Sequence, residues 1–387
     1  MILGIDASNL RGGGGITHIS EILAHAQPNG FYFKCVIIWG GFITLTKLCD
    51  QPWLEKVHVP KLDRTLPWRV QWQQFVLPEL IKQTRCNVIF SPGGILPWRS
   101  SVPAITMSRN MLPFEPKEAS RYRSISMKLK LKVLNFFQSI SFKRADGLIF
   151  MTQYAQESVC TQLEKPPEKI AIIPHGISKN FFLPPKRQNS IQHYSPSRPF
   201  RLLYVSTVNV YKHQWHVVYA VAALREKGFP VTIEFVGSFY PQALRRFKNA
   251  MQQVDPNGAF INYKGFVPYN ALPEIYHNAD AFVFASSCEN MPNILLEAMA
   301  SGLPIACSSR GVMPELLGNA GIFFDPESPG QMTDVLTVLL KDRGLRAQYA
   351  QVAYERAREY SWERCARETF SFLAEVVKTN KGATKNV

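Results

Sequence analysis

The sequence predicts an α/β protein made of two doubly wound parallel-sheet domains. Short apolar runs alternate with amphipathic helical patterns along most of the 387 residues, which is typical of parallel strands joined by helices. The chain is also roughly two to three times the length of an average domain. The strand–helix pattern begins at 2–6 and begins again at 201–206. A polar, proline-rich stretch at 184–199 separates the two series, and we interpret it as a linker.

The predicted strands fall into two series. The first contains residues 2–6, 33–39, 56–59, 87–91, 104–107, 147–151 and 169–174. The second contains residues 201–206, 231–237, 260–265, 281–286, 304–308 and 321–325. Only helical patterns follow residue 327. We therefore predict an N-terminal domain over 1–186, a C-terminal domain over 187–359, and a last helix within 360–387 that packs back onto the first domain. The two domains are expected to face each other across a cleft, with ligands beyond the carboxyl ends of the strands.

Composition predicts a cytoplasmic protein, either soluble or peripheral on the inner face of a membrane. The seven cysteines are scattered without a C-x-x-C pair, which favours a reducing compartment and no zinc site. The N-terminus MILGIDASNL has no basic region before its apolar residues and does not resemble a signal peptide. The apolar run 35–49 is too short and too interrupted by glycine to span a bilayer.

The net charge of +15 is concentrated in the first half of the chain, and most sharply at 121–144. This segment has seven basic residues and no acidic one, with Phe136, Phe137, Ile140 and Phe142 among them. It is either a solvated helix with apolar core contacts or a face that meets anionic lipid or an anionic acceptor. No nucleic-acid-binding motif accompanies the charge, so we do not expect nucleic acid as a partner.

A glycine-rich loop at 11–23 follows the first predicted strand. The consecutive glycines Gly12 to Gly15 allow the backbone to approach a ligand closely just before a helix begins. Their spacing matches neither the ATP-binding nor the dinucleotide-binding glycine motif. The loop is therefore an anion or sugar contact, or else a flexible turn.

Lys212 lies in the loop that opens the second domain, near the start of a predicted helix. A cation at a helix N-terminus opposes the helix dipole, and its position makes sense if an anion lies between the two. The alternative is a solvated surface lysine.

Two carboxylates, Glu289 and Glu297, stand in an otherwise small and apolar segment at 286–309. Asn293 is expected to cap the helix that contains Glu297. Taken alone, Glu297 could be a helix acid in a salt bridge, and Glu289 a loop acid exposed to solvent. Together with a lysine and a glycine-rich loop, they suit the hydroxyl pairs of a ribose and of a sugar, with a diphosphate held between them.

The segment 265–326, GFVPYNALPEIYHNADAFVFASSCENMPNILLEAMASGLPIACSSRGVMPELLGNAGIFFDP, resembles the retaining glycosyltransferases of the GT-B fold, family 4 (glycosyl transferases group 1). The family's E-x7-E motif is met by Glu289 and Glu297. The resemblance runs from Gly4 to about Ala374 and is strongest in the second half of the chain.

The resemblance implies a role for each matching residue. Lys212 would bind the donor diphosphate, Glu297 the nucleotide ribose, and Glu289 the transferred sugar. The backbone N–H groups of Met291, Asn293 and Ile294 would meet sugar and phosphate.

Three further positions follow from the same resemblance. Val267 would lie beside the base, and Gly14 and Gly15 would contact the donor phosphate or the acceptor from the other domain.

The chain departs from the family pattern at several positions. Thr207 and Val208 stand where the family often has an arginine that binds phosphate; Thr207 is kept among the substrate-binding candidates. Pro292 replaces a residue with an N–H donor. Arg109 stands where many members have a histidine, and it would either supply the missing phosphate cation or meet the acceptor.

The resemblance therefore implies transfer of a sugar, with retention, from a nucleotide-diphosphate sugar. The expected donor is a GDP- or UDP-sugar, as in a mannosyltransferase, and the expected acceptor is a saccharide or lipid-linked saccharide in cell-surface polysaccharide or glycolipid synthesis. No cofactor is expected, and no metal, because no His/Asp/Glu cluster has ligand spacing. The alternatives are a glycoside hydrolase using Glu289 and Glu297, and a non-catalytic protein that binds a sugar or polyanion.

Overall fold

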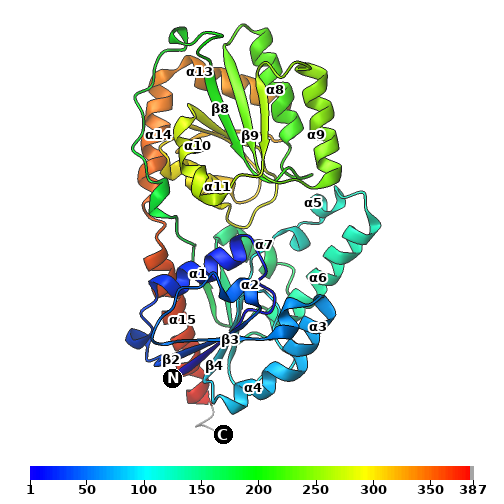
Figure 1. Ribbon diagram of the computed structural model, residues 1–387, viewed down its shortest axis with the longest axis vertical. Helices are drawn as coiled ribbons and strands as arrows, with labels where there is room; N and C mark the ends of the chain where they lie inside the picture. Colours follow the sequence, from blue (N-terminus) through cyan, green and yellow to red (C-terminus); the bar gives the residue numbers. More distant parts are fainter. Residues whose placement is uncertain (384–387) are drawn as a thin grey trace. The chain divides into compact units, whose positions relative to one another are not determined.

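The computed structural model describes residues 1–383, which form two compact units (Figure 1). Unit 1 contains Met1–Phe114, Ser126–Gly176 and the chain from Ser361 onward. Unit 2 contains Glu115–Ile125 and Ile177–Tyr360.

Unit 1 is built on a seven-stranded parallel sheet in the order β3-β2-β1-β4-β5-β6-β7. Its strands are β1 (Ile2–Asp6), β2 (Cys35–Gly40), β3 (Leu54–His58), β4 (Val88–Ser91), β5 (Ala104–Met107), β6 (Gly147–Phe150) and β7 (Ile170–Ile172). The chain winds outward from β1 in both directions, so the order reverses between β1 and β4. Asp6 ends β1 at that point, where its buried carboxylate accepts hydrogen bonds from the Ser8 N–H (2.9 Å) and the Ser91 hydroxyl (3.1 Å). These bonds fix the loop that follows β1.

The helices of unit 1 connect these strands. They are α1 (Gly14–His25), α2 (Phe42–Leu45), α3 (Leu66–Gln71), the π-helical turn η3 (Trp72–Val76), α4 (Leu77–Gln83), α6 (Ile125–Lys143), α7 (Gln153–Cys160) and α15 (Trp362–Ala383), with 3-10 turns η1 (Pro28–Phe31), η2 (Pro60–Asp63) and η4 (Leu112–Phe114). The C-terminal helix α15 packs on this unit. A Cβ atom at Gly147 would lie only 2.9 Å from Val376 and 3.0 Å from Phe372, so this glycine permits the close approach of α15 to β6.

Unit 2 repeats the design with a six-stranded parallel sheet in the order β10-β9-β8-β11-β12-β13. Its strands are β8 (Phe200–Val205), β9 (Val231–Val236), β10 (Ile261–Gly265), β11 (Ala281–Phe284), β12 (Ile305–Ser308) and β13 (Ile322–Phe324). Its helices are α5 (Pro116–Ser120), α8 (Gln214–Glu226), α9 (Pro241–Val254), α10 (Leu272–Asn278), α11 (Asn293–Ala300), α12 (Met313–Leu317), α13 (Pro329–Lys341) and α14 (Arg343–Ala357), with turns η5 (Lys179–Phe181), η6 (Ile191–His193) and η7 (Tyr269–Ala271). Helix α8 packs against α9 and α13, and α11 packs against α14 (Figure 1). The order reverses between β8 and β11, so loops at the carboxyl ends of those strands occupy the expected ligand position.

The prediction of two doubly wound parallel sheets is confirmed, and all thirteen predicted strands are present. The predicted domain boundary and linker differ from the structure. Residues from Ile177 onward group with unit 2 because Phe181 packs against Tyr276 (ring centroids 5.7 Å apart) and the Leu183 N–H donates to Ala300 (3.0 Å). The stretch 184–199 also lies against unit 2, where Arg346 donates to Gln188 (3.1 Å).

A second difference concerns 115–125, which the sequence assigned to the first domain. Arg121 forms an ion pair with Glu327 (2.6 Å), and the Tyr122 hydroxyl donates to Asn209 (3.0 Å). These contacts place the segment in unit 2. The sequence carries no pattern that would reveal such long-range pairing. The arrangement of the domains across a cleft stays a prediction.

Candidate functional site

The two loops at the reversal point of the unit 2 sheet carry Lys212 and Glu289. Lys212 follows β8, Glu289 follows β11, and the Lys212 Nζ forms an ion pair with the Glu289 Oε1. The side chains are only 8% and 14% exposed. A solvated surface lysine is therefore the wrong interpretation of Lys212. The anion opposite this cation is a carboxylate of the protein itself.

The position of Lys212 is fixed by its neighbours. Its carbonyl accepts a hydrogen bond from the buried Tyr204 hydroxyl (2.5 Å), and its ammonium lies 5.3 Å from the ring centroids of both Tyr211 and Phe284. His213 follows in a left-handed conformation (φ 52°) and begins α8. Aromatic faces attract a cation and exclude water, so the ammonium is held in place with few waters around it.

Glu297 lies one turn into α11 and is 3% exposed. The Tyr276 hydroxyl donates to its Oε2 (3.1 Å). Burial raises the pKa of the Glu297 carboxyl to about 7, although hydrogen bonds from Tyr276 and Tyr269 oppose the rise. A carboxyl group that titrates near neutral pH in a buried position is unusual outside functional sites.

The predicted N-cap of α11 is wrong. Pro292 occupies the capping position in an extended conformation (φ −77°, ψ 109°), and Asn293 is the first helical residue. The ring of Pro292 fixes φ near the value that this position needs, and its carbonyl accepts from the Leu295 N–H (3.1 Å). Next to the cap, Met291 is buried, while Asn293 and Ile294 are partly exposed at the start of the helix.

Two further candidates of unit 2 lie in other loops of the carboxyl edge. The Thr207 hydroxyl is 3.1 Å from the Ser238 hydroxyl, which follows β9, and the Thr207 carbonyl accepts from Gln214 (3.1 Å). Val267 follows β10 and is partly buried beside the exposed Phe266. Thr207 therefore joins the loops after β8 and β9, and Val267 belongs to the loop after β10.

In unit 1 the structure brings Arg109, Gly14 and Gly15 together. Arg109 follows β5, and its guanidinium donates to the carbonyls of Gly14 (Nη2, 2.6 Å) and Gly15 (Nη1, 3.3 Å) in the first turn of α1. Burial lowers the pKa of Arg109 to about 10, so it remains a cation at neutral pH. Gly13 precedes the helix with φ 59°, a conformation that favours glycine. Arg109 thus holds the glycine-rich loop in a defined position.

No sequence pattern indicates the group of residues that lies beside the Lys212 loop. The Ser287 hydroxyl donates to Glu118 (2.5 Å) and lies 2.9 Å from the His213 Nε2, while Glu118 also accepts from Arg121 (2.6 Å). Burial, with a further contribution from Arg121, lowers the pKa of His213 to about 3. The imidazole is therefore neutral. Glu118 and Ser287 are 169 positions apart, so no local spacing could reveal them.

Two buried histidines, His175 and His18, are packing residues in unit 1. His175 stacks on Trp362 (ring centroids 5.7 Å apart), and His18 is buried against the edge of the same ring. Burial lowers the pKa of His18 well below its ordinary value, and Arg109 and His175 lower it further.

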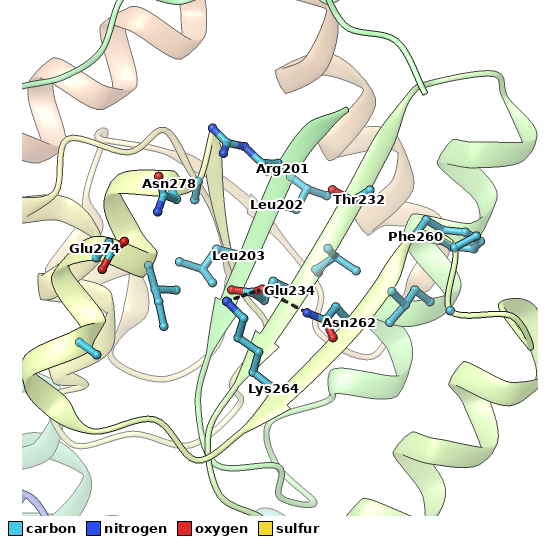
Figure 2. A pocket seen from close by; sticks show the side chains of 17 residues that line it. Arg201, Leu202, Leu203, Thr232, Glu234, Phe260, Asn262, Lys264, Glu274 and Asn278 are labelled. Atoms are coloured by element: carbon cyan, nitrogen blue, oxygen red, sulfur yellow. Dashed lines mark hydrogen bonds and ion pairs between the residues drawn. The ribbon is translucent and has the colours of Figure 1, made fainter. Parts of the chain in front are cut away.

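A hollow of about 690 Å³ lies elsewhere in unit 2 and contains none of the predicted site residues (Figure 2). It lies over β8, β9 and β10 beside α10. Glu234 in its lining is paired with Lys264 (3.0 Å) and accepts from Asn262 (3.2 Å). The other charged groups of the lining are Arg201 and Glu274, so the hollow has no net charge. The carboxyl-end loops therefore remain the candidate site.

Two features are absent from the part of the chain that the structure describes. Residues 1–383 contain no helix long and apolar enough to cross a bilayer. Within the same residues, no three His, Cys, Asp or Glu side chains lie where they could hold a metal ion together.

Comparison with known proteins agrees with the geometry. The family model "Glycosyl transferases group 1" matches residues 185–356, and the model "Glycosyltransferase Family 4" matches residues 12–181. The two models together cover most of both units. The chain belongs to the group 1, family 4 glycosyltransferases.

The curated relatives match over part of their length. The O-antigen chain mannosyltransferase B of Escherichia coli is 33% identical over 112 residues, which are 29% of each chain. The D-inositol 3-phosphate glycosyltransferase of Salinispora arenicola is 25% identical over 247 residues, or 60% of this chain and 54% of the relative. The matches thus span about a third to about half of these relatives.

Solved structures of similar fold match along almost the whole chain. A sucrose-phosphate synthase from Thermosynechococcus elongatus has a TM-score of 0.75 at 16% identity, covering 99% of this chain and 100% of that one. The Anabaena protein HepE, in complex with UDP and glucose, has a TM-score of 0.69 at 16% identity, covering 95% and 97%. These likenesses confirm the GT-B fold class.

Proposed function

We propose that this protein transfers a sugar from a nucleotide-diphosphate sugar to a saccharide or lipid-linked saccharide, with retention at the anomeric carbon. The observation that carries the proposal is the buried pair of Lys212 and Glu289, which lies on the two loops at the sheet reversal of unit 2. The buried Glu297, which belongs to the same E-x7-E segment as Glu289, is the third residue of the proposed donor site.

Each group has a chemical task in this proposal. The donor diphosphate takes the place of Glu289 as the partner of Lys212, because it carries more negative charge. This exchange frees the Glu289 carboxylate to accept hydrogen bonds from hydroxyl groups of the transferred sugar. Glu297 accepts hydrogen bonds from the hydroxyl groups of the nucleotide ribose.

Catalysis consists mainly of stabilising the leaving diphosphate. Negative charge grows on the diphosphate as the bond to the anomeric carbon breaks, and a preorganised cation opposite that charge lowers the barrier. The leaving phosphate oxygen then takes the proton of the acceptor hydroxyl on the same face of the sugar. Because Lys212 supplies the positive charge, we propose that no metal ion is required.

The donor class is supported by similar proteins. HepE has been solved with UDP-glucose, and the relatives include an O-antigen chain mannosyltransferase. We propose a GDP- or UDP-sugar as donor, in cell-surface polysaccharide or glycolipid synthesis. The seven cysteines are all free, which supports a cytoplasmic location.

A donor screen tests this function. GDP-, UDP-, dTDP- and ADP-sugars are incubated with the protein, with and without free or lipid-linked saccharides, and nucleotide release is measured with and without EDTA. Release that depends on the acceptor and resists EDTA is expected. Cleavage of a glycoside without any nucleotide would indicate a hydrolase instead. Binding without turnover for every pair would indicate a sugar- or polyanion-binding protein.

Arg109→Ala is expected to lower kcat by about 10–100-fold and to leave the donor Kd unchanged. The guanidinium holds the carbonyls of Gly14 and Gly15, and a small displacement of groups that position a substrate costs up to about 10²-fold in rate. Steady-state kinetics and donor titration measure the two effects. Arg99→Ala removes an exposed cation of the same unit and serves as control. Unchanged kcat and acceptor KM in Arg109→Ala would show that the contact has no part in turnover.

Helix α6 has the surface expected of a peripheral membrane contact. Four large apolar side chains on this helix, Leu129, Val133, Phe136 and Phe137, are 40–60% exposed. Their spacing of four, three and one residues places them along one side of the helix. The exposed lysines Lys128, Lys130 and Lys132 lie among them. Apolar groups flanked by cations suit the boundary between acyl chains and anionic headgroups, so we propose that α6 contacts an anionic membrane.

Changing Lys128, Lys130 and Lys132 to Glu is expected to abolish sedimentation with anionic liposomes at low salt. Each cation near an anionic surface contributes about 1 kcal/mol, and reversal turns attraction into repulsion. The wild-type protein should be released at high salt. The same reversal at Lys165, Lys248 and Lys341, which are exposed cations outside α6, preserves the net charge of the variant and should have little effect. Equal wild-type binding to neutral and anionic liposomes, or none to either, would contradict a charged membrane contact.

A further inference from the structure

A second pocket in unit 2 is strongly cationic. It has a volume of about 930 Å³ and lies between the start of α8, one side of α9 and the segment that precedes α6. Four arginines line it: Arg121, Arg123, Arg245 and Arg246. Glu327 is the one acidic residue of the lining. The proposed sugar-transfer site requires none of these side chains.

The single acid, Glu327, does not neutralise the other arginines of the pocket, because Arg121 already balances its charge. Arg121 makes two hydrogen bonds to the Glu327 carboxylate (2.6 and 3.0 Å), and this contact holds the pKa of Glu327 at about 2. Arg123 and Arg245 make no hydrogen bond or ion pair with any of the described residues. Three guanidinium groups are therefore left without a countercharge, and like charges this close repel unless an anion lies between them.

The wall of the pocket contains a buried donor that lacks an acceptor. Trp215 is 3% exposed, and its indole Nε1 has no hydrogen-bond partner among residues 1–383. Arg246 lies over the ring, with its guanidinium carbon 4.1 Å from the centroid. The indole nitrogen is closed off from solvent, so Trp215 contributes to the pocket through its ring, which holds the Arg246 guanidinium in place.

We propose that this pocket binds a phosphate-bearing ligand through Arg123, Arg245 and Arg246, with Arg246 held over the Trp215 ring. Guanidinium groups match the geometry of phosphate oxygens and bind them with two hydrogen bonds at once. The volume exceeds that of a lone phosphate and lies within the range of small-molecule sites, so the phosphate is part of a larger molecule. That molecule is either a free phosphate ester or the headgroup of a lipid. The proposal does not depend on the sugar-transfer assignment.

The test measures the affinity of the protein for inorganic pyrophosphate by isothermal titration calorimetry. The Lys212→Ala variant is the background, because it removes the other candidate diphosphate site. In this background, combined Arg245→Ala and Arg246→Ala substitutions are expected to weaken pyrophosphate binding at least tenfold. Lys248→Ala removes an exposed cation of the same helix α9 outside the lining, and it should change the Kd less than twofold.

Vesicles that contain phosphatidylglycerol distinguish the two sources of phosphate. If these vesicles compete with pyrophosphate for the pocket of the Lys212→Ala variant, the ligand is a headgroup; if the pyrophosphate affinity is unchanged in their presence, the ligand is a free phosphate ester. Three results would overturn the proposal. These are no pyrophosphate binding in the Lys212→Ala background, binding that survives the double substitution, and equal loss of binding in Lys248→Ala.

Discussion

Lys212→Ala is expected to lower kcat by about 10²–10³-fold, the effect found when one preorganised group that stabilises a developing charge is removed. The loss should exceed the rise in donor KM, because the charge on the diphosphate grows in the transition state. The lysine is well placed for this task. It is nearly buried, lies between two aromatic rings, and is held by the Tyr204 hydroxyl. Its removal also leaves the buried Glu289 carboxylate without its partner.

Lys227→Ala provides the matched control for this prediction. Lys227 follows the last turn of α8, the helix that begins just after Lys212, and pairs only weakly with Asp334 at 3.7 Å on the surface. The Lys227→Ala variant should retain wild-type kinetics. Thermal unfolding of both variants separates a catalytic loss from a folding defect. If Lys212→Ala retains both kcat and donor KM while remaining folded, the leaving-group site lies elsewhere.

Glu297→Gln is expected to weaken donor binding by about 10–100-fold and to remove its pH dependence. A charged acceptor of a hydroxyl hydrogen bond contributes about 1.5–3 kcal/mol. The Glu297 carboxyl must be ionised to accept both ribose hydroxyls, and burial raises its pKa to about 7. The wild-type affinity for an intact nucleotide sugar should therefore fall as the pH drops below about 7, approaching tenfold per pH unit. The glutamine variant should show a constant, weak affinity between pH 5.5 and 8.

The same carboxyl makes a stability measurement possible on the free protein. Its pKa in the folded chain lies above its ordinary value of 4.5, so the folded state binds the proton more tightly than the unfolded state. The difference in the free energy of unfolding between wild type and Glu297→Gln should then decrease by about 3 kcal/mol as the pH rises from about 4.5 to above 7. Taking the difference removes the contribution of other buried groups such as His213, whose lowered pKa changes the stability in the opposite direction. A wild-type donor affinity that is flat with pH would contradict the role assigned to Glu297.

The sequence predicted the strands well because strands buried on both faces are short apolar runs between helical patterns. Every predicted strand lies within two residues of the observed one. The candidate residues Glu289 and Glu297 could be predicted because they are close in sequence and belong to a family motif. The structure adds the pairing of Lys212 with Glu289, which are 77 positions apart and whose loops only the sheet order brings together.

The errors of the sequence interpretation have physical causes. The polar stretch 184–199 has the composition of a linker, but the buried Arg346 satisfies its hydrogen-bonding groups against unit 2. The segment 115–125 joins unit 2 through Arg121 and Tyr122, whose partners lie far along the chain. Asn293 is a good N-cap by residue type, yet the fixed φ of Pro292 moves the helix start by one position. In each case a tertiary contact or a ring constraint decided what local composition could not.

A crystal structure with the nucleoside diphosphate released in the donor screen would show whether Lys212, Glu289 and Glu297 form the donor site. We expect a phosphate oxygen within hydrogen-bond distance of the Lys212 Nζ and both ribose hydroxyls donating to the Glu297 carboxylate. We also expect that the Glu289 carboxylate no longer pairs with Lys212. A nucleotide bound elsewhere, with the Lys212–Glu289 pair intact and Glu297 still contacted only by the tyrosines, would contradict this donor site.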